Sequence, residues 1–316
     1  MGYYVVKGGN EISGTCHIRG SKNATLPILV ATLLTEDEVI LENCPEIEDV
    51  THTLEILRQL GCDVTIEERT VTISAKNLKD VEVPVDLACK MRSSILFFGA
   101  LLARAGIAKI PRPGGCVIGE RPINLHVNAF KQMGVVISEE DCALYGQVKH
   151  ILGYHIYLDY PSVGATENIL LLSVLAKGTT VIYNAAKEPE IVSLVRFLKQ
   201  CGAEIYGEGT ETIMIEGVKK LHGTCFQLPF DRIQAGSFLT ASALTGGNIF
   251  LEGVAHEGMD AICRILEDVG CQFRWSPSGL FMQAPKVLYS NVKITTGPYP
   301  QFPNKSVKLK ATSKNL

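Results

Sequence analysis

Four segments of this sequence end in the same way, and the repeat that they form limits the folds open to the chain. In each segment an amphipathic run that predicts a helix is followed by a glycine, and then by a short alternating run that predicts a strand. Upstream of each glycine, a polar start, an apolar helix, a turn, a strand and a loop recur in the same order. The glycines are Gly61, Gly134, Gly202 and Gly270, which stand roughly 70 residues apart. The sequence therefore predicts an α/β fold of repeated β-α-β-α-β-β units, of which four are present.

The predicted helices of these units are apolar over wide faces. Such helices need cover on more than one side, so several units are expected to pack their helices inward and to place their sheets outside. The 316 residues, 46% of them hydrophobic, are enough for two domains of this kind. Each unit opens with polar residues at a helix start, which brings the helix N-termini to equivalent positions, and helix N-termini attract anions.

Composition excludes several classes of function. A net charge of −3 argues against a general nucleic-acid binder or a membrane-surface protein. The apolar runs are too short to span a bilayer and no signal peptide follows Met1, so we expect a cytoplasmic location. The ten cysteines lack C-x-x-C spacing and the seven histidines lack metal-ligand spacing. We therefore expect reduced thiols and no zinc site.

The stretch from 111 to 125, PRPGGCVIGERPINL, departs from the repeat. Its prolines and glycines exclude a regular helix or a central strand, so Cys116 is expected on a loop whose backbone can approach a ligand closely. A loop cysteine five residues before Arg121 is a candidate for a reactive thiol, although most free cysteines are simply packed as small hydrophobes. The equivalent loops of the first and third units are shorter and poor in glycine, and a loop elaborated in one repeat alone favours a functional role.

Other candidates stand at the starts of the units. Lys22 and Asn23 follow a turn and a capping serine, where a lysine suits a phosphate or carboxylate clamp, although a lone lysine is more often a solvated surface residue. Arg92 opens the second unit, and together with Arg121 it suits bidentate phosphate contacts; separate surface salt bridges are the alternative.

The third and fourth units open with two further candidates. Ser162, Val163 and Gly164 offer backbone N–H groups to an anion or a carbonyl, or form a plain helix cap. Asp231 and Arg232 suit either a catalytic pair or an ion pair between domains, and we favour the structural role. The stretch 188–190, Glu-Pro-Glu, predicts a helix start.

Taken together, seven stretches resemble the UDP-N-acetylglucosamine 1-carboxyvinyltransferases, a family of enolpyruvyl transferases. They are GSKNATLPILVATLL, MRSSIL, PGGCVIGERPINLH, YPSVGATEN, NAAKEPEIV, EGTETIMIEGV and DRIQAGSFL, and the resemblance extends from about Tyr4 to Pro303. It implies an inside-out α/β barrel of six units, three per domain, of which four are present here. The expected division is a complete domain at 21–229, a partial second domain formed by 1–20 with 230–303, and an atypical tail at 304–316 that is rich in lysine and lacks acidic residues.

The resemblance also implies a reaction and its substrates. Phosphoenolpyruvate is protonated at C3, the 3′-hydroxyl of UDP-N-acetylglucosamine attacks C2, and phosphate leaves the tetrahedral ketal, without a metal or an organic cofactor. This is the first committed step of peptidoglycan synthesis. Both partners are small molecules, and neither a nucleic acid nor a membrane is implied.

Individual residues take roles from the same resemblance. Cys116 matches the proton donor or product-release cysteine that fosfomycin alkylates, and Lys22 with Asn23 matches the pair whose lysine binds phosphoenolpyruvate. Arg92 and Arg121 match arginines that contact anionic groups of the substrates. The nucleotide-sugar contacts match Arg121, Pro122, Ile123, Asn124, Leu125, Ser162, Val163 and Gly164.

The chain departs from the family pattern at two positions. Asn124 stands where many members have Asp, which bears on a contact to uridine. Asn304-Lys305 stands where the family has Thr-Asp, and a lysine cannot easily accept the proton of the sugar hydroxyl.

Two units of the six are also missing, which leads to an alternative expectation: a truncated homologue that turns over poorly or not at all, binds nucleotide sugar at most weakly, and self-associates through apolar surface around 238–244 and 261–269. The sister enzyme that makes 5-enolpyruvylshikimate 3-phosphate is a further option, but it lacks the cysteine loop.

Overall fold

The four repeat glycines all end helices, as the sequence predicts. In the computed structural model, which describes residues 3–114, 122–289, 294 and 296–303, their φ angles are 100° at Gly61, 95° at Gly134, 97° at Gly202 and 104° at Gly270. This left-handed conformation disfavours side chains with a Cβ and lets the chain reverse from helix to strand. A pair of antiparallel strands follows each glycine. The predicted mixed α/β fold is therefore confirmed.

The elements recur in the same order in each unit. The first unit has α1 (Lys22–Ala31), η1 (Thr32–Leu34), β2 (Val39–Glu42), α2 (Glu48–Gln59), β3 (Asp63–Glu67) and β4 (Thr70–Ser74). After α3 (Val85–Ala88), the second has η2 (Arg92–Ile95), α4 (Leu96–Ala105), β5 (Ile107–Pro111), α5 (Asn124–Gln132), β6 (Val136–Glu140) and β7 (Ala143–Gln147). The third has β8 (His155–Tyr157), α6 (Val163–Ser173), β9 (Thr179–Tyr183), α7 (Pro189–Gln200), β10 (Glu204–Tyr206) and β11 (Thr212–Glu216).

The fourth unit is completed by a strand from the other end of the sequence. It comprises α8 (Arg232–Thr245), β13 (Asn248–Glu252), α9 (Asp260–Asp268), β14 (Gln272–Ser276) and β15 (Gly279–Gln283), and β1 (Gly14–His17) pairs in parallel with β13. Conversely, β12 (Cys225–Gln227) pairs in parallel with β2 of the first unit. Two short strands, β16 (Thr296–Gly297) and β17 (Phe302–Pro303), pair with each other.

The segment that connects β1 to α1 and the segment that connects β12 to α8 run side by side in opposite directions. Gly20 and Phe230 form an antiparallel bridge, flanked by bonds from Ser21 N–H to the Pro229 carbonyl (2.7 Å) and from Asp231 N–H to the Arg19 carbonyl (2.8 Å). A Cβ on Gly20 would lie 2.0 Å from the backbone oxygen of Asn43. The tight packing at this crossing therefore requires glycine.

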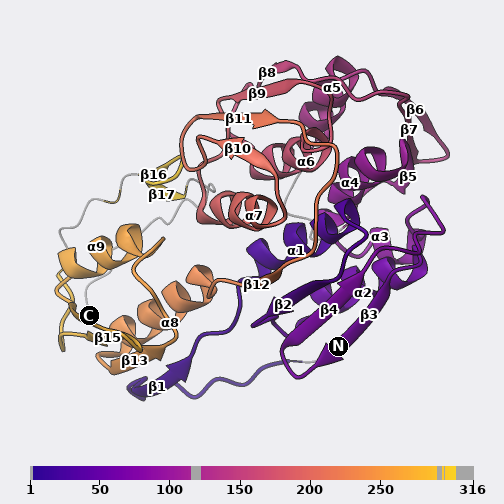
Figure 1. The fold of residues 1–316 in the computed structure, drawn as a ribbon. Helices are drawn as coiled ribbons and strands as arrows, with labels where there is room; N and C mark the ends of the chain where they lie inside the picture. Colours follow the sequence, from indigo (N-terminus) through magenta and orange to yellow (C-terminus); the bar gives the residue numbers. More distant parts are fainter. Residues whose placement is uncertain (1–2, 115–121, 290–293, 295, 304–316) are drawn as a thin grey trace.

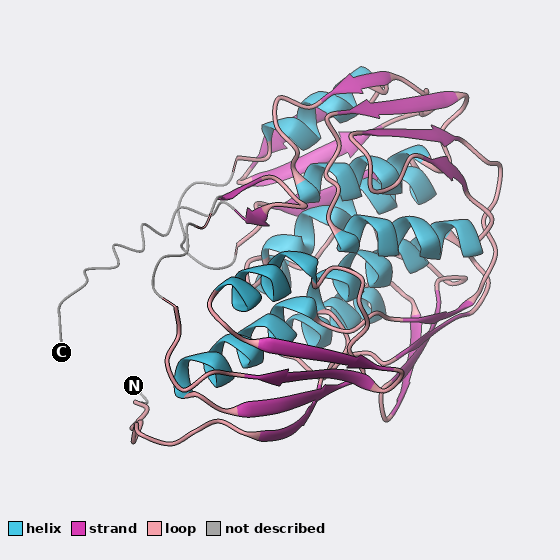
Figure 2. Ribbon diagram, turned by 90° about the vertical axis from the view of Figure 1, so that its left-hand side faces the viewer, coloured by secondary structure: helices cyan, strands magenta, loops and turns pink. Residues whose placement is uncertain are grey.

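The first three units share one core. Figure 1 shows α1, α4 and α6 between the sheets of these units, and Figure 2 shows the helices stacked between strands. From Ala24 onward all of α1 is buried, and α6 is buried from Ala165 onward. A cluster that extends from Leu26 to Leu228 forms this core, and a second, smaller cluster joins Ile18 to residues between Ala235 and Ala284. The named domain boundaries and the inside-out barrel with six units remain predictions.

Helix α8 is less covered than its counterparts. Only Ala235, Leu239, Ser242 and Ala243 are buried in it, whereas Ile233 is 51% and Leu244 71% exposed. Leu244 belongs to the apolar surface that the sequence predicts around 238–244, whereas Ile233 lies outside that stretch and Leu239 within it is buried. Around 261–269 the outcome is mixed, since Cys263 and Leu266 are buried. Within the described ranges no helix combines the length and the apolar character needed to cross a bilayer.

Candidate functional site

The first candidate pair, Lys22 and Asn23, lies at the exposed start of α1. Ser21 caps this helix, because its Oγ accepts a hydrogen bond from Ala24 N–H (3.4 Å). The Lys22 ammonium forms an ion pair with Asp49 on α2. The cation that the sequence predicts for an anionic ligand is thus held by a carboxylate in this structure, and an incoming anion would compete with Asp49 for it.

The start of α8 is tied to the start of α1. Asp231 caps α8 by accepting from Ile233 N–H (2.8 Å) and Gln234 N–H (3.0 Å), and its other oxygen accepts from Lys22 N–H (3.2 Å). One carboxylate therefore orients two helix N-termini that belong to different core clusters.

Arg232 forms the second link between the two parts of the molecule. Its guanidinium donates from Nε and from an Nη to the two oxygens of Glu190 on α7, at 3.0 and 3.2 Å. Glu190 is only 4% exposed, and the Tyr299 ring lies 5.8 Å from the guanidinium carbon. Of the two alternatives left open for Arg232, this ion pair supports the structural one. Pro189 does begin α7, as predicted.

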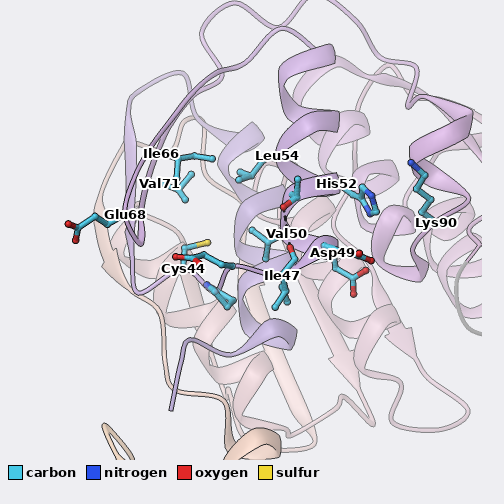
Figure 3. A pocket seen from close by; sticks show the side chains of 14 residues that line it. Cys44, Ile47, Asp49, Val50, His52, Leu54, Ile66, Glu68, Val71 and Lys90 are labelled. Carbon is cyan, nitrogen blue, oxygen red and sulfur yellow. Dashed lines mark hydrogen bonds between the residues drawn. The ribbon is translucent and has the colours of Figure 1, made fainter. Parts of the chain in front are cut away.

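A hollow of about 780 Å³ lies over the first half of α2. In the view of Figure 3, Asp49, His52 and Lys90 lie on one side of it and Glu68 lies on the other. Asp49 lines this hollow and also pairs with Lys22, so the hollow adjoins the start of α1.

A second hollow, of about 690 Å³, brings together residues that are far apart in sequence. Its lining includes four predicted site residues, Arg92, Pro122, Ile123 and Asn124, beside Arg112 and Lys131. Arg112 is paired with Glu139 (Nε to Oε1, 2.6 Å). The nucleotide-sugar residues expected around 122–124 therefore share one concave surface with Arg92.

The third candidate segment forms the start of α6. Ser162 caps this helix by accepting from Ala165 N–H (3.3 Å), and Val163 and Gly164 begin its first turn. A Cβ on Gly164 would lie 3.6 Å from His126 Cε1 and 3.8 Å from His126 Nε2. The structure thus places the α6 start against a histidine of α5.

His126 was not among the residues selected from the sequence. It is 6% exposed, and burial, together with the nearby Arg92, lowers its pKa to about 4. Its Nδ1 lies 3.0 Å from Nδ2 of the buried Asn168. The sequence contained no signal for this contact, because the two residues are 42 positions apart on different helices.

Glu167 is a second group that sequence reasoning missed. It is 6% exposed on α6, and burial, reinforced by Glu190 and Glu188, raises its pKa well above the usual range. A carboxyl of this kind stays protonated at pH values where surface carboxyls are ionised. It stands one helical turn after Gly164 and faces the group of carboxylates that Arg232 partly neutralises.

Cys116 and Arg121 lie outside the described residues, so their roles remain predictions. Leu125 is 6% exposed and belongs to the larger core, so its side chain serves packing. Among the described residues, no cluster of His, Cys, Asp and Glu has an arrangement that would hold a metal ion.

Comparison with known proteins shows to which class of enzymes this chain belongs. The sequence profile of the EPSP synthase family (3-phosphoshikimate 1-carboxyvinyltransferase) matches residues 6–314. The enolpyruvyl transferase NikO from Streptomyces tendae superposes with a TM-score of 0.76 at 23% identity, over 88% of this chain and 67% of that one. An EPSP synthase from Acinetobacter baumannii superposes with a TM-score of 0.68 at 21% identity, over 89% and 66%. At these identities the structures support the fold. The profile places the chain in the carboxyvinyl (enolpyruvyl) transferase family, to which it belongs.

Within this family, the curated relatives that match carry one particular name. The UDP-N-acetylglucosamine 1-carboxyvinyltransferase of Nitratidesulfovibrio vulgaris is 42% identical over 303 residues, which are 96% of this chain and 72% of that protein. The protein named UDP-N-acetylglucosamine 1-carboxyvinyltransferase 1 of Caldanaerobacter subterraneus subsp. tengcongensis is 45% identical over 300 residues, 95% of this chain and 72% of that one. The resemblance noted in the sequence is therefore confirmed.

Proposed function

We propose that this chain transfers the enolpyruvyl group of phosphoenolpyruvate to the 3′-hydroxyl of UDP-N-acetylglucosamine by addition and elimination, in the cytoplasm, as the first committed step of peptidoglycan synthesis. The observation that carries the proposal is the 42–45% identity to proteins named for this substrate over nearly the whole chain. Cys116 would donate the proton or release the product. Lys22, Asn23, Arg92 and Arg121 would bind the anionic groups.

The arrangement of charges and helix starts is consistent with this assignment. Anionic substrates need cations and N–H groups that are already in place. The start of α6 supplies N–H groups, and Lys22 and Arg92 supply charge. The hollow beside Arg92, Pro122 and Asn124 has a volume in the range of small-molecule sites. It is the place where we expect the nucleotide.

The direct test is a turnover assay on the purified chain. Inorganic phosphate release is measured with phosphoenolpyruvate and UDP-N-acetylglucosamine, and the product is identified by mass spectrometry. We expect phosphate release that requires this nucleotide sugar and is abolished by fosfomycin. A preference for shikimate 3-phosphate as the acceptor, or no binding of UDP-N-acetylglucosamine, would overturn the proposal.

Lys305, which lies outside the described residues, is the subject of a second test. Because a lysine cannot serve as the carboxylate base that the family motif carries here, we expect slow turnover in the wild type and a higher kcat in Lys305→Asp. A matched change at Lys308, in the same tail, should leave the rate as it is. Equal rates for the wild type and Lys305→Asp would exclude this role for position 305.

Lys22 gives a third test. Removal of the charge with Lys22→Gln should raise the KM for phosphoenolpyruvate by roughly 10- to 100-fold, the usual value of a hydrogen bond to a charged group. The same change at the exposed Lys219 should leave this KM unaltered. Steady-state kinetics at saturating nucleotide sugar measures both, and an unchanged KM in Lys22→Gln would remove Lys22 from the anion site.

A further inference from the structure

The sheet of the third unit has an aromatic outer surface. Its strands β8, β9, β10 and β11 lie outside α6 and α7 (Figure 1), and every second side chain of each strand points away from these helices. The outward positions include three tyrosines and a methionine: Tyr157, Tyr183, Tyr206 and Met214. Tyr157 is 70% and Tyr206 53% exposed. These four residues form the aromatic face of the sheet.

The register of the strands makes the aromatic face continuous. Tyr206 on β10 pairs with Met214 on β11, and the next outward position of β11 pairs with Tyr183 on β9. Tyr183 in turn pairs with Tyr157 on β8, and the two rings are stacked with their centroids 4.3 Å apart. Neighbouring strands lie about 4.8 Å apart, so the four side chains cover one unbroken area of the surface.

The repeat supplies an internal comparison for this surface. In the first unit the outward positions of β3 and β4 are all polar: Asp63, Thr65, Glu67, Thr70, Thr72 and Ser74. In the second unit Tyr145 is the single aromatic residue at the outward positions of the described strands β5, β6 and β7, and it pairs with Lys109 and Ser138. Since two equivalent sheets fold without such rings, the aromatic face serves contact with another molecule rather than the fold.

The charge of this surface indicates what kind of molecule fits it. The four described strands carry two carboxylates at outward positions, Glu204 and Glu216, and hold no lysine or arginine. The two glutamates are paired across β10 and β11, and Thr179 Oγ1 donates to both oxygens of Glu216, at 2.9 and 2.8 Å. Aromatic sheets can stack nucleic-acid bases, but they do so beside cations that hold the phosphates. A second copy of the chain would bring two acidic surfaces together. A basic partner is the complementary one.

The spacing of the two features matches an extended segment. Glu216 and Thr212, which pairs with Tyr183, are four residues apart on β11, roughly 13 Å along the strand. Residues i and i+4 of an extended peptide span the same length on one of its faces. Arginine suits both ends, because its guanidinium pairs with carboxylates and also stacks on tyrosine rings. An apolar residue at i+2 would then lie over Tyr206 and Met214.

We propose that the aromatic face, together with Glu204 and Glu216, docks an extended basic segment of another protein, with arginine at positions i and i+4 and an apolar residue at i+2. One arginine pairs with the two glutamates, and the other stacks on the Tyr157–Tyr183 pair. This interaction goes beyond the proposed function, because the sheet surface contributes no residue to the candidate site and needs neither substrate.

Fluorescence anisotropy with a designed peptide tests the proposal on the full chain. The fluorescein-labelled probe has arginine at i and i+4, leucine at i+2 and serine elsewhere, and the reference peptide has glutamate in place of both arginines. We expect the wild type to bind the arginine peptide roughly 10-fold more tightly or better, with an affinity that falls as the salt concentration rises. Absence of binding, or equal binding of the two peptides, would overturn the proposal.

Variants of the sheet surface locate the binding site. Tyr157→Ser combined with Tyr206→Ser should weaken binding of the arginine peptide roughly 5- to 20-fold, whereas Tyr145→Ser on the second sheet should bind as the wild type does. Glu204→Gln combined with Glu216→Gln should weaken it roughly 10-fold and reduce its dependence on salt, whereas Glu67→Gln on the first sheet should not.

Two further outcomes would contradict the assignment. If the double tyrosine variant binds the peptide as tightly as the wild type, the aromatic face is not the docking surface. If that variant instead lowers the average mass in light scattering while peptide binding is unchanged, the surface joins two copies of this chain and the proposed partner is wrong.

Discussion

At the scale of single residues, the starts of α6 and α7 bring three carboxyl groups close enough to interact, those of Glu167, Glu188 and Glu190. Glu167 and Glu190 are both buried, and Arg232 bonds Glu190 through both carboxylate oxygens. Ionisation of Glu167 would add a second buried negative charge beside that pair. The raised pKa of Glu167 means that the fold retains a proton there.

Glu167→Gln tests this retained proton. Because the folded-state pKa lies above the unfolded value of about 4.3, the folded chain binds the proton more tightly, and stability from this group is complete below that value and falls as the pH rises toward the folded pKa. Glutamine does not titrate. The free energy of unfolding of the variant should therefore exceed that of the wild type by a margin that grows from pH 5 to pH 8.

Urea unfolding at several pH values provides this measurement. The control is the same change at the exposed Glu67 on β3, which should follow the wild type at each pH. Parallel curves for the wild type and Glu167→Gln would mean that Glu167 is ionised in the folded chain.

The effect of pH on stability through His126 has the opposite sign. Its folded pKa of about 4 lies below the unfolded value of about 6.5, so the stability that it contributes is present above pH 6.5 and is lost as the pH falls through the folded pKa. For a shift of this size the loss approaches roughly 3 kcal/mol. His126→Gln should remove that part of the acid sensitivity, as measured by unfolding at pH 4 and pH 7. Equal acid sensitivity in the wild type and His126→Gln would contradict this role of His126.

At the scale of elements, the sequence predicts what depends on neighbours along the chain. The helix ends at Gly61 and Gly202 and the start of α7 at Pro189 follow local rules, and each was predicted correctly. The cap at Ser162 was one of two alternatives that the sequence left open, and the structure shows that the cap forms. The Asn168–His126 contact was not predictable from the sequence. It depends on how α4, α5 and α6 pack, and neither residue type nor spacing signals that packing.

The choice of sheet that β1 and β12 each join likewise depends on tertiary pairing. Both strands are short, and their own residues would suit pairing with any neighbour. The repeat pattern alone therefore predicts the units but does not specify which unit each of these strands completes. For the same reason an ion pair between domains at Asp231 and Arg232 could be suggested only as one of two alternatives. Its partner Glu190, 42 positions before Arg232, was not predicted.

Helix packing around Asn168 gives an element-scale prediction. A Cβ on Gly99 of α4 would lie 2.2 Å from Asn168 Oδ1 and 2.7 Å from its backbone oxygen, so Gly99→Ala must separate α4 from α6. We expect a loss of about 1–3 kcal/mol, as for other overpacked sites. The control is Gly236 in α8, where the Cβ meets only Ile262 Cγ1 at 3.7 Å. Gly236→Ala should gain roughly 0.5–1 kcal/mol.

Thermal and urea unfolding of the two alanine variants measures this contrast. A Gly99→Ala protein as stable as the Gly236→Ala protein would show that the α4–α6 contact can relax without cost.

At the scale of the whole molecule, two ion pairs of different burial connect the two core clusters. Arg232 bonds the buried Glu190, whereas Arg196 on α7 meets Glu257 at 2.9 Å with both side chains 54% exposed. A buried pair that loses one partner leaves an uncompensated charge, and an exposed pair is screened by water. The connection between the clusters should therefore depend far more on Arg232 than on Arg196.

Paired substitutions measure this difference. Arg232→Gln should lower stability by about 3 kcal/mol and increase cleavage by proteases near Phe230, because Glu190 is left without its cation. Arg196→Gln should cost about 0–1 kcal/mol. In a double-mutant cycle, Arg232→Gln should cost less in the background of Glu190→Gln. Additive effects in that cycle would exclude direct coupling between the two residues.

The exposed face of α8 gives a second whole-molecule prediction. Ile233 and Leu244 expose large apolar side chains, and self-association through this face is what the sequence leads us to expect. Leu244→Lys should lower the average mass in light scattering at high protein concentration. The same change at Val136, an exposed apolar residue on β6, should not. Unchanged association in Leu244→Lys would rule out this face.

The pairing of β1 and β12 with strands distant in the sequence also has a consequence for folding during translation. β1 leaves the ribosome before any other strand, yet its partner β13 emerges only after the helices of the first three units. The sheet of the first unit, in turn, lacks one edge strand until β12 has been made. Neither core can close in the order in which the chain is made, so an unpaired strand edge persists through most of translation, when pairing with a neighbouring nascent chain is most readily possible.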